Sequence, residues 1–165
     1  KGDTMQKMRL EFTYNVYDKL TDLPKDEQEL VDRAISATEA SYSPYSKFRV
    51  GAAVQMETGE IITGCNIENN VYPLGLCAER VAVFSALSKY PNQKIYKIAI
   101  AASTDQFQFD KPVSPCGSCR QVLVEFETRQ NKDIKIILHG NDKIYVVDSA
   151  SSLLPLTFNE TNLKL

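Results

Sequence analysis

Three cysteines and one glutamate are the residues of this sequence best suited to carry chemistry. They lie in two short segments, Cys77-Ala-Glu79 and Pro115-Cys116-Gly-Ser-Cys119. Zn²⁺ binds thiolate sulfur, and three protein ligands leave its fourth tetrahedral position open for water. The metal turns that water into a hydroxide near neutral pH, and a nearby carboxylate can take the proton and deliver it elsewhere. We therefore expect Cys77, Cys116 and Cys119 to hold one zinc ion, with Glu79 as the catalytic acid and base.

The charge of such a centre needs compensation, because three thiolates and one dication carry a net charge of −1. Both cysteine segments are expected to begin helices, where free N–H groups and the helix dipole favour negative charge. Arg80 directly follows the glutamate, and we expect it to donate hydrogen bonds to a ligand sulfur, outside the metal's own ligands. Arg120 is the alternative for this role.

A second interpretation of the cysteines is a structural zinc site without activity. A closed site needs a fourth protein ligand, and the remaining candidates are Cys65 and the single histidine, His139. That interpretation leaves Glu79 without a role. Cys65 and His139 both lie at the ends of predicted strands, where a packed or locally hydrogen-bonded side chain is the simpler expectation.

The pattern of apolar residues and turns predicts one domain of alternating helices and strands. We expect helices over 24–41, 77–89 and 115–129, and strands over 48–56, 60–66, 98–102, 134–139 and 143–147. This order requires a sheet with helices on both faces and some parallel strand pairs. Residues 25–165 then form the domain, and 1–24 an N-terminal extension with a possible strand at 8–16 and a tag remnant at 1–6.

Composition narrows the possible partners and the compartment. The net charge of −2 and the pI near 5.5 give no basic patch for a nucleic acid. No apolar run reaches the roughly 20 residues of a membrane helix, and residues 1–6 contain no signal-peptide core. Four cysteines, two of them in Cys-x-x-Cys, fit a metal site in a reducing compartment better than disulfides. We therefore expect a cytoplasmic protein that binds neither nucleic acid nor membrane.

At these residues the chain resembles the cytidine deaminase family, in particular its small homotetrameric enzymes with a three-cysteine zinc site. The resemblance spans most of residues 25–160 and is carried by five segments: Ser43-Pro-Tyr-Ser-Lys-Phe-Arg-Val-Gly-Ala-Ala, Thr63-Gly-Cys-Asn-Ile-Glu-Asn, Tyr72-Pro-Leu-Gly-Leu-Cys-Ala-Glu-Arg, Ser114-Pro-Cys-Gly-Ser-Cys-Arg-Gln-Val-Leu and Leu153-Leu-Pro-Leu-Thr-Phe. It implies a three-layer α/β/α sandwich with a central mixed five-stranded sheet.

The resemblance also implies a pyrimidine nucleoside site beside the metal. Asn66 and Glu68 match the family's Asn-x-Glu, which hydrogen-bonds the ribose 3′-hydroxyl. Phe48 matches the aromatic residue that packs on the pyrimidine, and Ala78 matches the residue whose backbone contacts the base. These residue types suit their roles, because an amide and a carboxylate bind a sugar diol and an aromatic face packs on a flat base.

A homotetramer with active sites shared between subunits is implied in the same way. Tyr72 and Phe158 match aromatic residues that reach a neighbouring subunit's pocket. The chain departs from the family at Asn70-Val71, where two small residues are usual, and this affects the expected ribose pocket. The loop 106–111 and the N-terminal extension are longer than usual, and no function is assigned to them.

The resulting functional hypothesis is hydrolytic deamination of cytidine and 2′-deoxycytidine to uridine and deoxyuridine, with release of ammonia, as in pyrimidine salvage. In the expected mechanism, zinc-bound hydroxide attacks C4 while Glu79 moves the protons. Two alternatives remain open. One is a related deaminase acting on another cytosine-bearing compound, such as blasticidin S, or on an editing substrate. The other is an interaction module with structural zinc.

Overall fold

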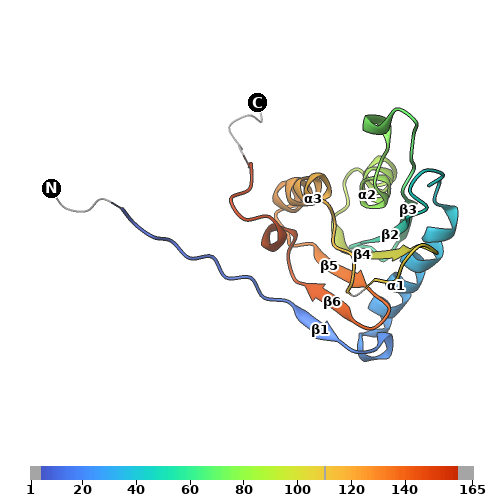
Figure 1. Cartoon of the computed structure of the whole chain (residues 1–165). Helices are drawn as coiled ribbons and strands as arrows, with labels where there is room; N and C mark the ends of the chain where they lie inside the picture. Colours follow the sequence, from blue (N-terminus) through green and yellow to red (C-terminus); the bar gives the residue numbers. More distant parts are fainter. Residues whose placement is uncertain (1–4, 110, 160–165) are drawn as a thin grey trace.

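A computed structural model describes residues 5–109 and 111–159 of the chain. These residues form a six-stranded sheet in the order β1-β6-β5-β4-β2-β3, with helices on both faces (Figure 1). The strands are β1 (Asn15–Tyr17), β2 (Arg49–Met56), β3 (Ile61–Cys65), β4 (Ile95–Ser103), β5 (Lys135–His139) and β6 (Ile144–Val147), and the α-helices are α1 (Lys25–Ala37), α2 (Ala78–Lys89) and α3 (Gly117–Gln130).

The predicted α/β/α architecture is confirmed, with one difference in the sheet. It has six strands instead of the expected five, because β1 pairs antiparallel with β6. The strand foreseen over 8–16 is ordered as a strand only from Asn15. The proposed tag remnant begins in residues 1–4, which lie outside the described residues, and the division of the chain at residue 25 stays a prediction.

The pairing of the strands is mixed. The β2–β3 hairpin is antiparallel, β2 also pairs antiparallel with β4, and β4 pairs parallel with β5. The β4–β5 connection runs through α3, as a parallel pair requires. The expectation that some strand pairs are parallel is therefore confirmed.

Side chains of the central strands alternate between two apolar layers, as a strand covered on both faces requires. On one face Ala99 and Ala101 pack with α1, through its buried Leu30 and Val31. On the other face Ile98 and Ile100 lie in the cluster that also contains buried residues of α2 and α3. No helix within the described residues is long and apolar enough to cross a membrane.

Strand β3 and the first turn of α2 are in direct backbone contact at Gly64. A Cβ atom at this position would lie 2.4 Å from the Ala82 nitrogen and 2.8 Å from the Ala78 oxygen. Both distances are far shorter than a van der Waals contact, so only glycine fits. The contact sets the height of the α2 N-terminus above the sheet, and that N-terminus carries one of the cysteine segments.

Glu127 ties α3 to two other parts of the chain. Its carboxylate is 5% exposed and lies between α3, the start of β5 and the 3₁₀ helix η4 (Ala150–Leu153). It accepts hydrogen bonds from three backbone N–H groups and two hydroxyls: those of Ile134, Ala150 and Ser151, and those of Ser149 and Ser151. The four donors of Ser149, Ala150 and Ser151 hold η4 against α3, and the Ile134 N–H ties the residue before β5 to the same carboxylate.

The segment that precedes β1 differs from the rest of the molecule. Residues 5–14 run away from the sheet as an extended arm, blue in Figure 1, and all of them are exposed. We refer to residues 5–14 as the N-terminal arm.

Candidate metal centre and adjoining cavity

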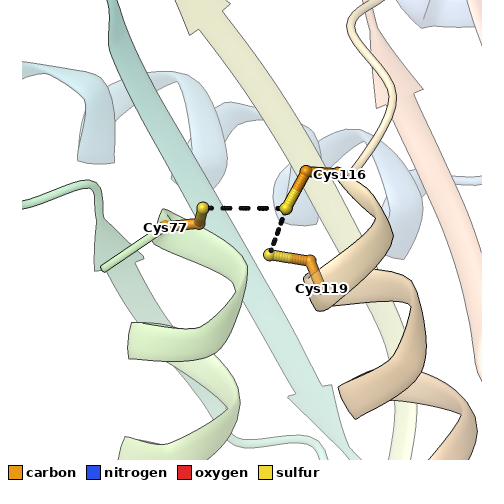
Figure 2. Close-up of side chains that lie close together, drawn as sticks. All are labelled: Cys77, Cys116 and Cys119. Atoms are coloured by element: carbon orange, nitrogen blue, oxygen red, sulfur yellow. Dashed lines mark hydrogen bonds between the residues drawn. The ribbon is translucent and has the colours of Figure 1, made fainter. Parts of the chain in front are cut away.

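The N-termini of α2 and α3 converge and bring three thiols together (Figure 2). Cys77 is the N-cap residue of α2, Cys116 is the N-cap residue of α3, and Cys119 is buried in the first turn of α3. The Sγ atoms of Cys77 and Cys116 lie 3.9 Å apart, and those of Cys116 and Cys119 lie 3.5 Å apart. All three sulfur atoms lie within 4.8 Å of one another.

This geometry fits a tetrahedral zinc ion. Zn–S bonds of 2.3 Å at tetrahedral angles place two ligand sulfur atoms about 3.8 Å apart. Within the described residues, the cluster that could share a metal contains the three cysteines and neither Cys65 nor His139. The Cys65 thiol instead donates a hydrogen bond to the Ala40 carbonyl, at 3.2 Å. The described residues thus supply three ligands and leave a fourth position open, as catalysis requires.

The protons of the cluster are shared unequally among the thiols. A hydrogen bond from Cys119, together with one from Arg80, lowers the pKa of Cys77 to about 5. The same hydrogen bond and burial raise the pKa of Cys119. Without a cation, negative charge therefore concentrates on Cys77. Thiols must be deprotonated to bind a metal, so a lowered pKa at Cys77 favours metal binding.

Two arginines were candidates to neutralise the ligands, and the structure separates them. Arg80 Nη2 donates a hydrogen bond to Cys77 Sγ at 3.5 Å, and its Nε is buried without a partner in the described part of the chain. Arg120 donates to the carbonyl oxygens of Pro115 and Leu153, at 2.8 Å and 2.9 Å. Arg120 therefore holds the turn before Cys116, and Arg80 contacts the sulfur.

Glu79 lies beside the thiols, in the first turn of α2. It is 5% exposed. Burial raises the pKa of its carboxyl group, and the negative charge of Cys77 adds to this effect, while hydrogen bonds from its own backbone and from Cys119 act against it. A carboxyl group whose pKa is raised above its ordinary value and that is shielded from bulk water is suited to give and take protons.

A cavity of about 540 Å³ adjoins the cluster at Cys77. Its lining includes Asn66 and Glu68, so the structure brings two of the expected substrate residues next to a metal ligand. Tyr72, which the resemblance assigned to a neighbouring subunit's pocket, also lines the cavity of its own chain. A volume of this size is in the range of small-molecule sites.

The polar groups of this cavity are already oriented by the protein. Asn66 Oδ1 accepts hydrogen bonds from Ser41 Oγ and the Val50 N–H, and its Nδ2 donates to the Phe48 carbonyl. The amide NH₂ group has two N–H donors, so its second N–H can serve another acceptor. The Glu68 carboxylate accepts hydrogen bonds from the Tyr45 N–H, the Ser46 N–H and the Ser46 hydroxyl.

Comparison with known proteins identifies the family. Residues 24–132 match the family model of the cytidine and deoxycytidylate deaminase zinc-binding region. A cytidine deaminase of Halalkalibacterium halodurans is 43% identical over 133 residues, which cover 81% of this chain and 94% of that protein. The crystal structure of cytidine deaminase from Burkholderia pseudomallei superposes with a TM-score of 0.68 at 37% identity, and the match covers 79% of this chain and 97% of that one.

The chain belongs to the cytidine and deoxycytidylate deaminase family. It is a zinc-dependent enzyme, and its cofactor is zinc. Another relative is a blasticidin-S deaminase of Bacillus cereus, 30% identical over 144 residues, which cover 85% of this chain and 97% of that protein.

Other residues expected from the family resemblance do not line the cavity. Ala78 is buried in the first turn of α2. Phe48 is partly buried and packs against the rings of Phe107 and Phe109, with centroids 6.4 Å and 5.6 Å away. Phe158 is 66% exposed on the surface, and its carbonyl accepts a hydrogen bond from Gln121.

The residues that orient Asn66 and Glu68 were not predicted from the sequence. Ser41 and Ser46 hold these side chains, and Ser46 stands in a segment that carried the family resemblance. Phe107 and Phe109 were left without a role. The sequence feature that could have indicated their packing is the alternation of two phenylalanines with polar residues in the loop 106–111.

Proposed function

We propose that this chain catalyses the hydrolytic deamination of cytidine and 2′-deoxycytidine at C4, with uridine or deoxyuridine and ammonia as products. The observation that carries the proposal is the convergence of three thiols at two helix N-termini, with a buried carboxyl group in the same helical turn. In this proposal Cys77, Cys116 and Cys119 hold the zinc ion. The relatives named cytidine deaminase support the choice of substrate.

Zinc held by these residues would supply a Lewis-acidic position that lowers the pKa of water to about 7. Arg80 offsets part of the thiolate charge through its hydrogen bond to Cys77, and the N–H groups at the starts of α2 and α3 do the same. Both effects keep the centre able to acidify water.

Glu79 moves the protons in two stages. It first accepts a proton from the attacking water and donates it to N3 of the pyrimidine, while the water oxygen forms a bond to C4. It then takes the proton of the new C4 hydroxyl group and donates it to the amino nitrogen. The C4–N bond breaks and ammonia leaves. The low exposure of Glu79 keeps bulk water away from both transfers.

The nucleoside would occupy the cavity beside Cys77. Glu68 and an N–H of Asn66 would bind the ribose 3′-hydroxyl. The hydrogen bonds that orient both side chains support this assignment. Phe48 and Ala78 do not line this cavity, and their assignment to the face and the edge of the base rests on the family resemblance alone. A single nucleoside is also the substrate that an acidic chain with a net charge of −2 favours over a nucleic acid.

A homotetramer with shared sites is part of the same proposal. Tyr72 and Phe158 are 77% and 66% exposed, which supports their assignment to a neighbouring subunit's pocket. We also retain the cytoplasmic location as a proposal. It is supported by the four free cysteines in the described residues, because three of them must stay reduced to bind zinc.

A second candidate substrate is blasticidin S, favoured by the relative of that name in Bacillus cereus. The two substrates share the cytosine amino group and differ in the sugar. Recognition by Asn66 and Glu68 favours the free nucleoside.

The test is a substrate panel assayed with the purified, zinc-loaded chain. Ultraviolet absorbance and ammonia release should show turnover of cytidine and deoxycytidine, and not of cytosine or dCMP, with blasticidin S tested in parallel. A chelator should abolish the activity and added zinc should restore it. Absence of activity on every compound while zinc is bound would refute the proposal.

A further inference from the structure

The N-terminal arm carries a regular pattern of side chains. Met8, Leu10, Phe12 and Tyr14 stand at alternate positions, and each is between 46% and 77% exposed. The side chains between them are polar. In an extended chain, alternate residues point to opposite sides. The arm therefore has one apolar side and one polar side, and it lies outside the region matched by the family model.

The two charges at the centre of the arm stand on its polar side. Arg9 and Glu11 form an ion pair at 3.0 Å with each other, and both side chains are largely exposed. Residues 5–14 are in no strand pair of the sheet. An extended segment with free N–H and C=O groups and an apolar side is a template for pairing with another strand.

We propose that the arm pairs antiparallel with the same segment of a second copy of this chain, about a two-fold axis at Leu10. In this register Arg9 of each copy stands opposite Glu11 of the other, and Met8 stands opposite Phe12. Two opposite-charge pairs and three apolar pairs then form at once, the third being Leu10 with Leu10 at the axis. Registers centred at Arg9 or at Glu11 place like charges directly opposite each other, which is unfavourable.

A hollow at the base of the arm supports this register. Its volume is about 270 Å³. Its lining combines aromatic and apolar residues, including Phe12, Tyr14, Tyr145, Val147 and Leu153, with the polar residues Lys111, Ser114 and Arg120. The rings of Tyr14 and Tyr145 lie 4.9 Å apart and join the arm to the sheet. With the axis at Leu10, Met8 of the second copy stands beside Phe12 and above the hollow. The flexible methionine side chain suits the aromatic part of this hollow, which Phe12, Tyr14 and Tyr145 form.

Contact with the sheet supplies the stabilising packing that an isolated two-stranded ribbon lacks. An isolated pair of strands is at best marginally stable in water. Here each end of the ribbon continues into β1, which is already paired with β6, and its apolar side rests on Tyr145 and the hollow. The second copy thus completes a surface that one copy leaves open.

Cysteine cross-linking in the full-length, zinc-loaded protein tests the register. Each variant is made in a Cys65→Ser background, because Cys65 is the cysteine outside the metal cluster. Leu10→Cys should form a covalent dimer under mild oxidation. Met8→Cys and Phe12→Cys, produced together with different tags, should form a mixed dimer, and each alone should not. Met8→Cys mixed with Thr13→Cys is the matched control, because these residues lie on opposite sides of the arm.

Charge exchange tests the polar side. Glu11→Arg should slow the cross-linking of Leu10→Cys by about fivefold or more, because two like-charge pairs then oppose each other. Adding Arg9→Glu to this variant should restore the rate. All these readouts are gel mobilities and rates of dimer formation, so they are independent of deaminase activity.

Equal cross-linking of all single-cysteine variants would indicate random collisions of the arms and would overturn the proposal. Failure of Leu10→Cys to cross-link, in protein that retains its zinc and its sedimentation behaviour under reducing conditions, would overturn it as well. A loss of rate in Glu11→Arg that Arg9→Glu does not restore would exclude the register centred at Leu10.

Discussion

Two buried glutamates on neighbouring helices, Glu79 and Glu127, have opposite properties. Each is 5% exposed. Burial raises the pKa of Glu79. Burial also acts to raise the pKa of Glu127, but the hydrogen bonds from Ser151, Ile134, Ser149 and Ala150 outweigh it and hold that pKa below its usual value.

The difference lies in the donors that surround each carboxylate. Glu127 has five donors from two distant segments, so its charge is fixed and it serves to connect α3 to η4. Glu79 has its own backbone and the Cys119 thiol. A buried carboxylate that is fully hydrogen-bonded stabilises the fold, whereas one that is not can exchange its proton. Equal burial therefore says little about role until the donors are known.

The largest effect expected from this contrast comes from Glu79→Gln. Turnover of cytidine should fall about a thousandfold, because an amide cannot accept and return a proton. Zinc content and the free energy of unfolding should change little, since Glu79 has few partners to lose. Steady-state kinetics, metal analysis and urea unfolding measure the three quantities. The control is Glu29→Gln, on the exposed side of α1. Near wild-type turnover in zinc-loaded Glu79→Gln would show that the assigned mechanism is wrong.

Glu127→Gln should produce the reverse pattern. The free energy of unfolding should fall by about 3 kcal/mol, because the amide removes the charge and turns an NH₂ group toward donors. The turnover number of the folded, zinc-loaded fraction should stay within about twofold of the wild type, since no donor of Glu127 is a metal ligand. Urea unfolding measures the loss of stability. Turnover divided by the amount of bound zinc measures the activity of the folded fraction. A variant with wild-type stability and lost activity would make Glu127 part of the site.

The pH dependence of stability should show the smallest effect. The pKa of Glu127 is lowered in the folded chain from its ordinary value of 4.5. Its contribution to stability is therefore fully present above pH 4.5 and is lost as the pH falls through the lower folded value. Urea unfolding from pH 7 down to pH 3 should show the wild type and Glu127→Gln converging at the acid end. A constant difference over this range would contradict the direction of the pKa shift.

The part of the site that follows from local patterns was predictable from the sequence. Cys77 and Cys116 both precede helical segments, and helices that cover one face of a sheet can present their N-termini together. That prediction needed no knowledge of distant contacts, and the structure places the three sulfur atoms together. The choice between Arg80 and Arg120 was also accessible, because Arg80 stands three residues after Cys77 on the same helical turn.

The features that the sequence did not predict depend on contacts between distant segments. The donors of Glu127 come from residues 134 and 149–151, and no periodicity in α3 indicates them. β1, the strand that raises the sheet from the expected five strands to six, is only three residues long. It is too short for an alternating pattern to mark its ends. The packing of Phe107 and Phe109 on Phe48 joins a loop to a residue far away in the sequence.

The contact at Gly64 has a practical consequence for altering this enzyme. A Cβ at this position would lie against the Ala78 oxygen and the Ala82 nitrogen, which are the acceptor and donor positions of an i→i−4 helical hydrogen bond near the start of α2. Any side chain there would displace the turn that carries Glu79. A library that diversifies the cavity to change the substrate should therefore leave codon 64 untouched, although glycine has no functional group to offer a substrate.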